Sequence, residues 1–150
     1  MMITRNLTIS LVLLASLMSF SAGAQAGQKD FGEYTVSWSV FPSTFLAPTI
    51  AQNNNLQRSN GIGVVNVVIM EEGENGQLRP VNGQIKGSIS NDIQQTTFLD
   101  FRRVKEGSSV YFLAQYQYQS GSLMTFNVTA QPTDSNKGLP VRFTHTLFQD

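Results

Sequence analysis

Residues 61–70, which read GIGVVNVVIM, decide the fold of this chain. The run is almost continuously apolar and rich in β-branched residues, which is the composition of a strand buried on both faces. A strand of that kind belongs at the centre of a sheet. We therefore expect residues 61–70 to form the core strand, with partner strands on either side of it in the sequence.

The clearest partner covers residues 33–41, which read EYTVSWSVF. Large apolar side chains alternate there with small polar ones, and a period of two is typical of a half-buried strand. Pro42 ends this strand. Pro48 then starts a stretch of helix-forming residues, so residues 48–52 are predicted to form one short helical turn that the asparagines at 53–55 terminate.

Further strands follow downstream of the core strand. Residues 81–90 form a weaker, mostly polar strand with two internal glycines, and we place it at the edge of a sheet. The sequence around Glu106 and Gly107 predicts a tight hairpin, because glycine supplies the positive φ that such a turn needs. The predicted strands are residues 33–41, 61–70, 81–90, 97–105, 109–118, 124–130 and 141–147.

Seven strands joined by short connections indicate an all-β protein. The pattern is typical of an antiparallel β-sandwich of immunoglobulin-like layout, with one short helix after the first strand. A small closed barrel is the alternative.

The N-terminus reads as a signal peptide. A short positive segment ends at Arg5, residues 7–20 are apolar and uncharged, and small residues follow. Signal peptidase requires a small-x-small pattern, which predicts cleavage after Ala24 or Ala26. We expect residues 1–26 to be the signal peptide and residues 27–150 to be a single β-sandwich domain located in the periplasm.

Composition narrows the function classes. Charged residues make up 13% of the chain, with ten basic and ten acidic side chains, so no basic surface for nucleic acid is expected. Cysteine is absent, which excludes disulfides, thiolate ligands and the lipid-attachment residue of a lipoprotein. We expect no cofactor, no metal and no membrane anchor after signal cleavage.

His145 is the only histidine, so any histidine-based triad would use it. Its neighbours on the same face of the predicted strand are Phe143 and Leu147, which favour a partly buried structural imidazole. The alternative is a hydrolase that combines His145 with a nearby serine and a carboxylate. No catalytic residue is assigned. The acidic residues Glu71, Glu72 and Glu74 lack the ligand spacing of a calcium loop, so we expect them to form a solvated hairpin tip.

A connection with large apolar side chains follows the first strand. Exposing large apolar side chains to water is unfavourable, so loop residues of this kind usually pack on the core or bind a partner. This segment is therefore either a lid on the core or a binding loop. The candidate binding residues are Phe41, Pro42, Ser43, Thr44, Phe45 and Leu46, together with Arg58.

Charge is concentrated in one hairpin arm, at Arg102, Arg103 and Lys105. In a chain so poor in charge, this arm is either an ion-paired outer face or a patch that docks a partner. Cross-strand charge pairs are common on exposed sheet faces, which favours the first interpretation.

These segments resemble the family called domain of unknown function 4426, small exported proteins of Gram-negative bacteria, over residues 31–149. The resemblance implies an exported β protein, and it transfers no catalytic role to any residue. The stretch at 53–55 is unusually polar for the family. The resemblance is carried by residues Tyr34 to Gln52, Arg58 and Ser59, Val65 to Val67, and Phe101 to Gln115.

The function expected from these observations is that of a non-catalytic binding or protein-interaction module. Its partner would be an envelope or periplasmic protein, or a peptide that pairs along the edge strand at 81–90. One alternative is a carrier of a small apolar ligand, with a cavity between the sheets lined by Trp38, Phe112 and Phe126. The other is the hydrolase.

Overall fold

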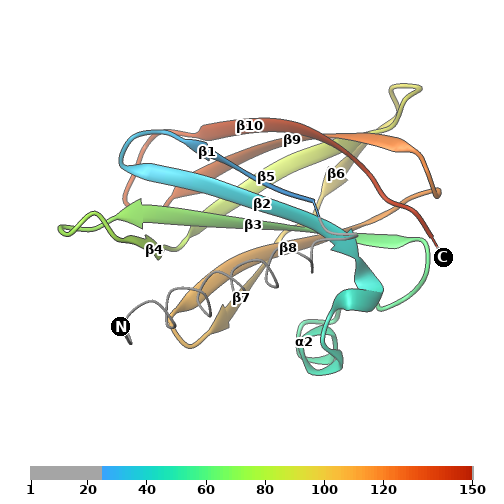
Figure 1. Ribbon diagram of the computed structural model, residues 1–150, viewed down its shortest axis with the longest axis horizontal. Coiled ribbons are helices and arrows are strands. Elements are labelled where there is room, and N and C mark those ends of the chain that lie inside the picture. The colour runs from blue at the N-terminus through green and yellow to red at the C-terminus, as the bar shows by residue number, and fades with distance from the viewer. Residues whose placement is uncertain (1–24, 150) are drawn as a thin grey trace, which may run out of the picture.

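The computed structural model describes residues 25–149, so all but the end of the predicted signal peptide lies outside the described residues. The described part is all-β, with ten strands and two short helices (Figure 1). The elements are β1 (Gln25–Asp30), β2 (Tyr34–Pro42), η2 (Ser43–Phe45), α2 (Pro48–Asn53), β3 (Ile62–Glu72), β4 (Leu78–Pro80), β5 (Gly83–Ser90), β6 (Thr96–Leu99), β7 (Arg102–Glu106), β8 (Ser109–Gln117), β9 (Leu123–Pro132) and β10 (Leu139–Thr146).

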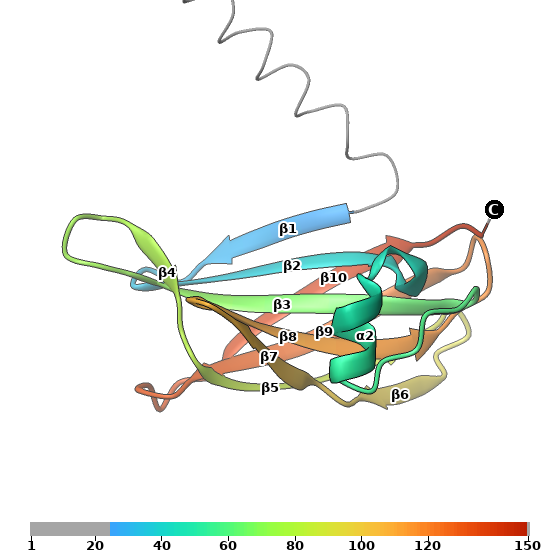
Figure 2. The ribbon, with the colours of Figure 1, turned by 90° about the horizontal axis from the view of Figure 1, so that it is seen from below.

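The strands form two antiparallel sheets that face each other (Figure 2). The first sheet has the order β1-β2-β3-β8-β7, with β4 paired to the end of β3. The second sheet has the order β10-β9-β5-β6. The main hydrophobic core lies between them and draws buried side chains from both sheets.

The core strand predicted at residues 61–70 is β3, and it lies at the centre of the first sheet, as predicted. Val65 and Val67 are fully buried and face the second sheet, because alternate residues of a strand share one face. Val64, on the opposite face, is also fully buried, beneath Leu46 and α2. The prediction of burial on both faces is therefore confirmed where α2 covers β3.

The predicted hairpin and helix are confirmed. β7 and β8 pair around Gly107, whose φ is +58°, and the pairing begins at Glu106 opposite Ser109. The short helix α2 begins at Pro48 and ends at Asn53, and Asn55 then takes a positive φ of 54°. A turn of asparagines ends the helix because asparagine tolerates the left-handed region.

The described residues form ten strands, three more than the seven predicted. β1 and β4 show neither the apolar alternation nor the apolar run from which strands were predicted, and β4 is only three residues long. The single strand predicted at 97–105 is two strands, β6 and β7, which belong to different sheets. The chain crosses from one sheet to the other at residues 100–101.

The edge position predicted for residues 81–90 is wrong, because β5 lies between β9 and β6. Its glycines mark a close approach between strands. A Cβ atom on Gly87 would lie 2.9 Å from the carbonyl oxygen of Asn127, and one on Gly83 would collide with the carbonyl oxygen of Gln131. Glycine weakens a strand in isolation, but here it lets β5 and β9 pack together.

Candidate binding groove

The candidate site lies along the part of one edge of β8 that no neighbouring strand covers. β8 pairs with β3 as far as Gln117, but on its other side it pairs with β7 only up to Leu113, which lies opposite Arg102. Before Arg102 the chain belongs to the second sheet. Within residues 25–149, no strand therefore pairs with the last residues of β8 on this side, and we call this gap the notch.

Two adjoining cavities of about 490 and 680 Å³ lie along the notch and form one groove. They share five lining residues: Ile62, Asn91, Gln95, Gln117 and Met124. Ile89, Leu99 and Tyr116 add apolar surface, whereas the remaining polar lining is mainly amide. The amides come from Gln57, Asn60, Asn91, Gln95, Gln115, Gln117 and Gln119. Asp92 is the one charged residue among all those that line the two cavities.

Hydrogen bonds within the loops hold the groove in shape. The Gln115 side chain accepts a bond from the Gln57 N–H (2.9 Å) and donates one to the Gln57 carbonyl (2.7 Å). The Oδ1 atom of Asn91 accepts from the N–H groups of Ile93 (3.2 Å) and Gln95 (2.9 Å). These contacts fix the segments on both sides of the notch before any ligand is present.

Four of the lining amides are free to bind a ligand. No hydrogen bond to another described residue is made by the side chains of Gln57, Asn60, Gln117 and Gln119. Each amide offers two N–H donors and one carbonyl acceptor. The groove thus presents neutral hydrogen-bond donors and acceptors next to an apolar floor formed by Ile89, Leu99 and Met124.

The predicted binding loop braces the groove and is only partly exposed. Ser43 is fully buried, and its hydroxyl donates to the Ser59 carbonyl (2.8 Å) and accepts from the Ser59 N–H (3.0 Å). Ser59 in turn lines the groove. Arg58 donates to the carbonyl of Thr44, an exposed residue, at 3.1 Å. The loop is therefore tied to the segment that forms one wall.

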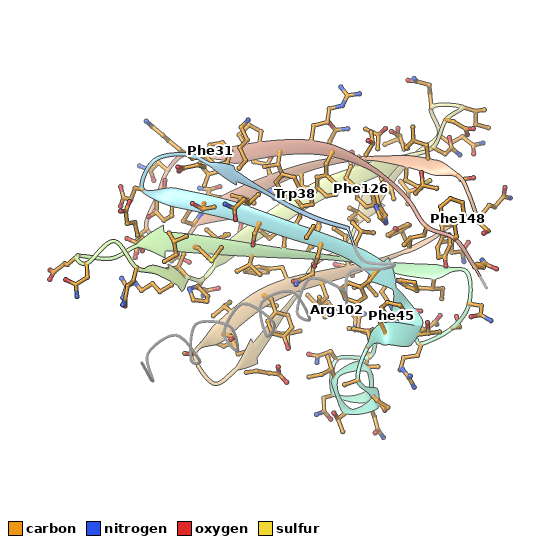
Figure 3. All side chains as sticks on the ribbon, viewed as in Figure 1. Phe31, Trp38, Phe45, Arg102, Phe126 and Phe148 are labelled. Atoms are coloured by element: carbon orange, nitrogen blue, oxygen red, sulfur yellow. The ribbon has the colours of Figure 1, made fainter. Side chains whose placement is uncertain are left out.

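The two large apolar residues of that loop have opposite surroundings. Leu46 is buried in the cluster beneath α2, as the core-lid interpretation expected, whereas Phe45 is 60% exposed. Phe41 is half-buried against the same cluster, and half-buried Pro42 ends β2 opposite Gly63. Figure 3 shows Phe45 and the exposed Phe148 toward the end of the molecule that carries the C-terminus.

The predicted charged residues do not form one patch. Arg102 and Arg103 point to opposite faces of β7, since successive strand residues alternate. Arg102 donates to the main-chain carbonyls of Asn54 and Asn55, and Arg103 donates to Oδ1 of Asn82 at 3.0 Å. Lys105 is exposed. Among the described residues the ion pair found is Arg79 with Glu71, at 3.8 Å, outside this arm.

Aromatic side chains occupy the space where a carrier cavity was expected. Phe112 and Phe126 are buried in the main core. Phe143 stacks between Trp38 and Phe126, with ring centroids 4.8 Å apart on each side. Tyr116 completes the row with an edge contact to Phe126 at 5.3 Å.

His145 was predicted to be partly buried, and it is more deeply buried than that, with 3% of its surface exposed. Burial lowers its pKa, because the charged imidazolium loses solvation. Burial likewise raises the pKa of Tyr116, whose hydroxyl lies in the protein interior.

The described residues hold no cluster of three or more histidine, cysteine, aspartate or glutamate side chains that could bind a metal ion.

Comparison with known proteins places this fold in a family. The model of the domain of unknown function DUF4426 matches residues 28–150. The chain belongs to the DUF4426 family. A crystal structure of a DUF4426 protein from Pseudomonas aeruginosa is 31% identical, with a TM-score of 0.74, and the match covers 83% of this chain and 96% of that one.

More distant structures share the fold. FetP from uropathogenic Escherichia coli, recombinantly expressed in the E. coli periplasm, is 11% identical with a TM-score of 0.59, over 85% of this DUF4426 chain and 97% of FetP. A copper-bound variant of FetP is 12% identical, with a TM-score of 0.59, over 83% and 97% of the two chains. No curated protein sequence matches the chain.

The described part of the DUF4426 chain contains no helix long and apolar enough to cross a membrane.

The groove itself was not predicted from the sequence. Its one local signal was the second half of the strand at 109–118, where glutamines alternate with buried residues. That pattern marks an amphipathic strand, but it does not show that one edge of the strand is free.

Proposed function

We propose that this DUF4426 protein is a non-catalytic binding module of the periplasm, and that its groove holds an uncharged ligand rich in hydrogen-bonding groups. The observation that carries the proposal is the set of free amides at Gln57, Asn60, Gln117 and Gln119, which lie on the end of β8 and on loops that are already fixed. Pre-ordered loops lose less conformational entropy on binding than mobile ones, which favours affinity. An immunoglobulin-like β-sandwich would serve as the rigid scaffold.

The chemistry of the lining selects the ligand. In the 490 Å³ cavity, which has no charged lining residue, a charged ligand would lose its hydration without meeting opposite charge, which is costly. Amide side chains instead exchange hydrogen bonds with neutral hydroxyl, amide or peptide groups, while the floor at Ile89, Leu99 and Met124 accepts apolar groups. The ligand is therefore neutral and amphipathic.

The periplasmic location rests on the predicted signal peptide, with cleavage after Ala24 or Ala26. We expect the binding partner to come from the envelope or the periplasm for the same reason. The fold shared with FetP, a protein that was expressed in the periplasm, agrees with this location.

The rival functions have less support. A hydrolase would need His145 to reach its substrate, yet its side chain is 3% exposed. An apolar carrier would need space between the sheets, where Phe143 stacks on Trp38 and Phe126.

Site-specific photo-crosslinking in the periplasm tests the proposal. A photo-reactive residue replaces Gln117 in the groove, and a matched variant carries it at Asn127, an exposed amide on the outer face of the second sheet. We expect a discrete adduct from position 117 that is lacking at position 127. Equal labelling from both positions, or none from 117, would contradict a binding role for the groove.

A further inference from the structure

We propose that the occupant of the groove is an extended, uncharged peptide segment that adds to the open edge of β8. This inference rests on the proposed function and deepens it, because it names the class of ligand and the atoms that recognise it. Strand addition to a free sheet edge is a general mode of peptide binding, in which main-chain hydrogen bonds supply affinity.

The register of the first sheet shows which main-chain groups face the notch. The N–H of Tyr118 bonds to the carbonyl of Gly61 at 2.9 Å and continues the ladder between β3 and β8. In an antiparallel pair, every second residue exchanges hydrogen bonds with its partner. Tyr116, opposite Gly63, therefore bonds toward β3, whereas the main-chain groups of Gln115 and Gln117 point into the notch.

Those groups are the ones that lack a strand partner. The next residue of β8 with the same orientation is Leu113, and it is paired with Arg102 of β7. An added segment would continue the sheet from the point where β7 stops. With about 3.3 Å per strand residue, the edge from Gln115 to Gln117 suits a segment of about four residues.

The groove also suits the side chains of such a segment. In a strand, alternate side chains point to opposite faces. One set would contact the floor formed by Ile89, Leu99 and Met124, and the other would face solvent beside Gln57 and the outer face of the sheet. The 490 Å³ cavity has no charged lining residue, so uncharged side chains fit it best.

β6 offers a competing edge, which the test must separate from β8. The Asn91 N–H bonds to the Gln95 carbonyl at 3.1 Å, in the same register as the rest of the β5–β6 pair. By the same alternation, the main-chain groups of Thr96 and Phe98 point away from β5. A ligand on that edge would leave Gln115 and Gln117 unprotected.

Residue-resolved amide hydrogen exchange on the mature protein provides the test. The probes are blocked hexapeptides in which threonine alternates with valine, leucine or phenylalanine, and a matched set in which threonine alternates with lysine. We expect an uncharged probe to slow exchange at Gln115 and Gln117 by about tenfold or more at saturation, because strand addition uses those N–H groups. The lysine set should bind more weakly.

Two controls isolate the main-chain bonds. Alternate N-methylation of the best probe removes donors and should weaken its binding by about tenfold, since two or so hydrogen bonds are lost. Gln117→Pro removes the side-chain amide and also one main-chain N–H on the open edge, where proline is tolerated, whereas Gln117→Ala removes the amide alone. We expect the proline variant to bind the probe about fivefold or more weakly than the alanine variant, because only the proline variant lacks the main-chain donor. Equal affinity of the two variants would contradict a main-chain bond at this position.

Three results would overturn the inference. One is the failure of every uncharged probe to bind. Another is protection confined to Thr96 and Phe98. The third is binding of a neutral saccharide, such as diacetylchitobiose, in the groove without protection of Gln115 and Gln117. If the adduct from position 117 is still obtained in any of these cases, the groove remains a binding site and only the ligand class is wrong.

Discussion

The side-chain amide of Gln115 clamps the main chain of Gln57, accepting from its N–H at 2.9 Å and donating to its carbonyl at 2.7 Å. The two residues are 58 positions apart in the sequence. Their contact fixes the segment between α2 and β3 against the outer face of β8, beside the notch. This side chain therefore holds one wall of the groove in place.

Replacing Gln115 should release that segment. Gln115→Ala loses both hydrogen bonds, and we expect the free energy of unfolding to fall by about 1–2 kcal/mol. Gln115→Glu keeps an acceptor but no donor, so its free energy of unfolding should lie between those of the alanine variant and the native chain. Urea denaturation of the three proteins measures this order. Equal stability of all three would show that the clamp adds nothing.

Ser43→Ala should destabilise the protein although the loop around it is partly exposed. The Ser43 hydroxyl is fully buried and makes two hydrogen bonds to Ser59, so its loss leaves both main-chain groups without that partner. We expect a cost of about 1–2 kcal/mol. The neighbouring change Thr44→Ala, at an exposed side chain, should alter stability by less than about 0.5 kcal/mol. If both variants unfold at the same urea concentration, the brace is unimportant.

Stability should decrease as the solution is acidified below the ordinary pKa of histidine. Burial lowers the pKa of His145 in the folded state, so the unfolded chain binds the proton more readily. The stabilisation from neutral His145 is complete above about pH 6.5 and is lost as the pH falls through the folded-state pKa. His145→Gln should flatten the pH dependence of the unfolding free energy between about pH 7 and pH 5. An unchanged slope in the variant would contradict this.

Signal cleavage should follow Ala24 and not Ala26. β1 begins at Gln25 and pairs with β2 through six residues, from Gln25 opposite Val40 to Asp30 opposite Thr35. Cleavage after Ala26 would remove two of these positions and shorten an edge strand. The intact mass of the exported protein checks the prediction, and a mature chain starting at Gly27 would refute it.

Much of the fold follows from local sequence pattern. The apolar run at 61–70 determines a central strand, because burying it requires neighbours on both faces. Gly107 determines a hairpin, since it readily takes a positive φ. Pro48 and Asn55 bound the short helix α2. Each of these features depends on residues a few positions apart, so the sequence alone was sufficient to predict them.

The tertiary structure decided which sheet each strand joined and which strand edge remained unpaired. Residues 97–105 precede the hairpin turn and were predicted to form one strand, but the chain leaves the second sheet after Leu99 and enters the first at Arg102. That crossover leaves Gln115 and Gln117 without a strand partner on the side of β8 away from β3, and it creates the groove. Alternating apolar residues predict that a segment forms a strand. They do not show which neighbouring strand will pair with each of its edges, because strand pairing depends on contacts between residues far apart in the sequence.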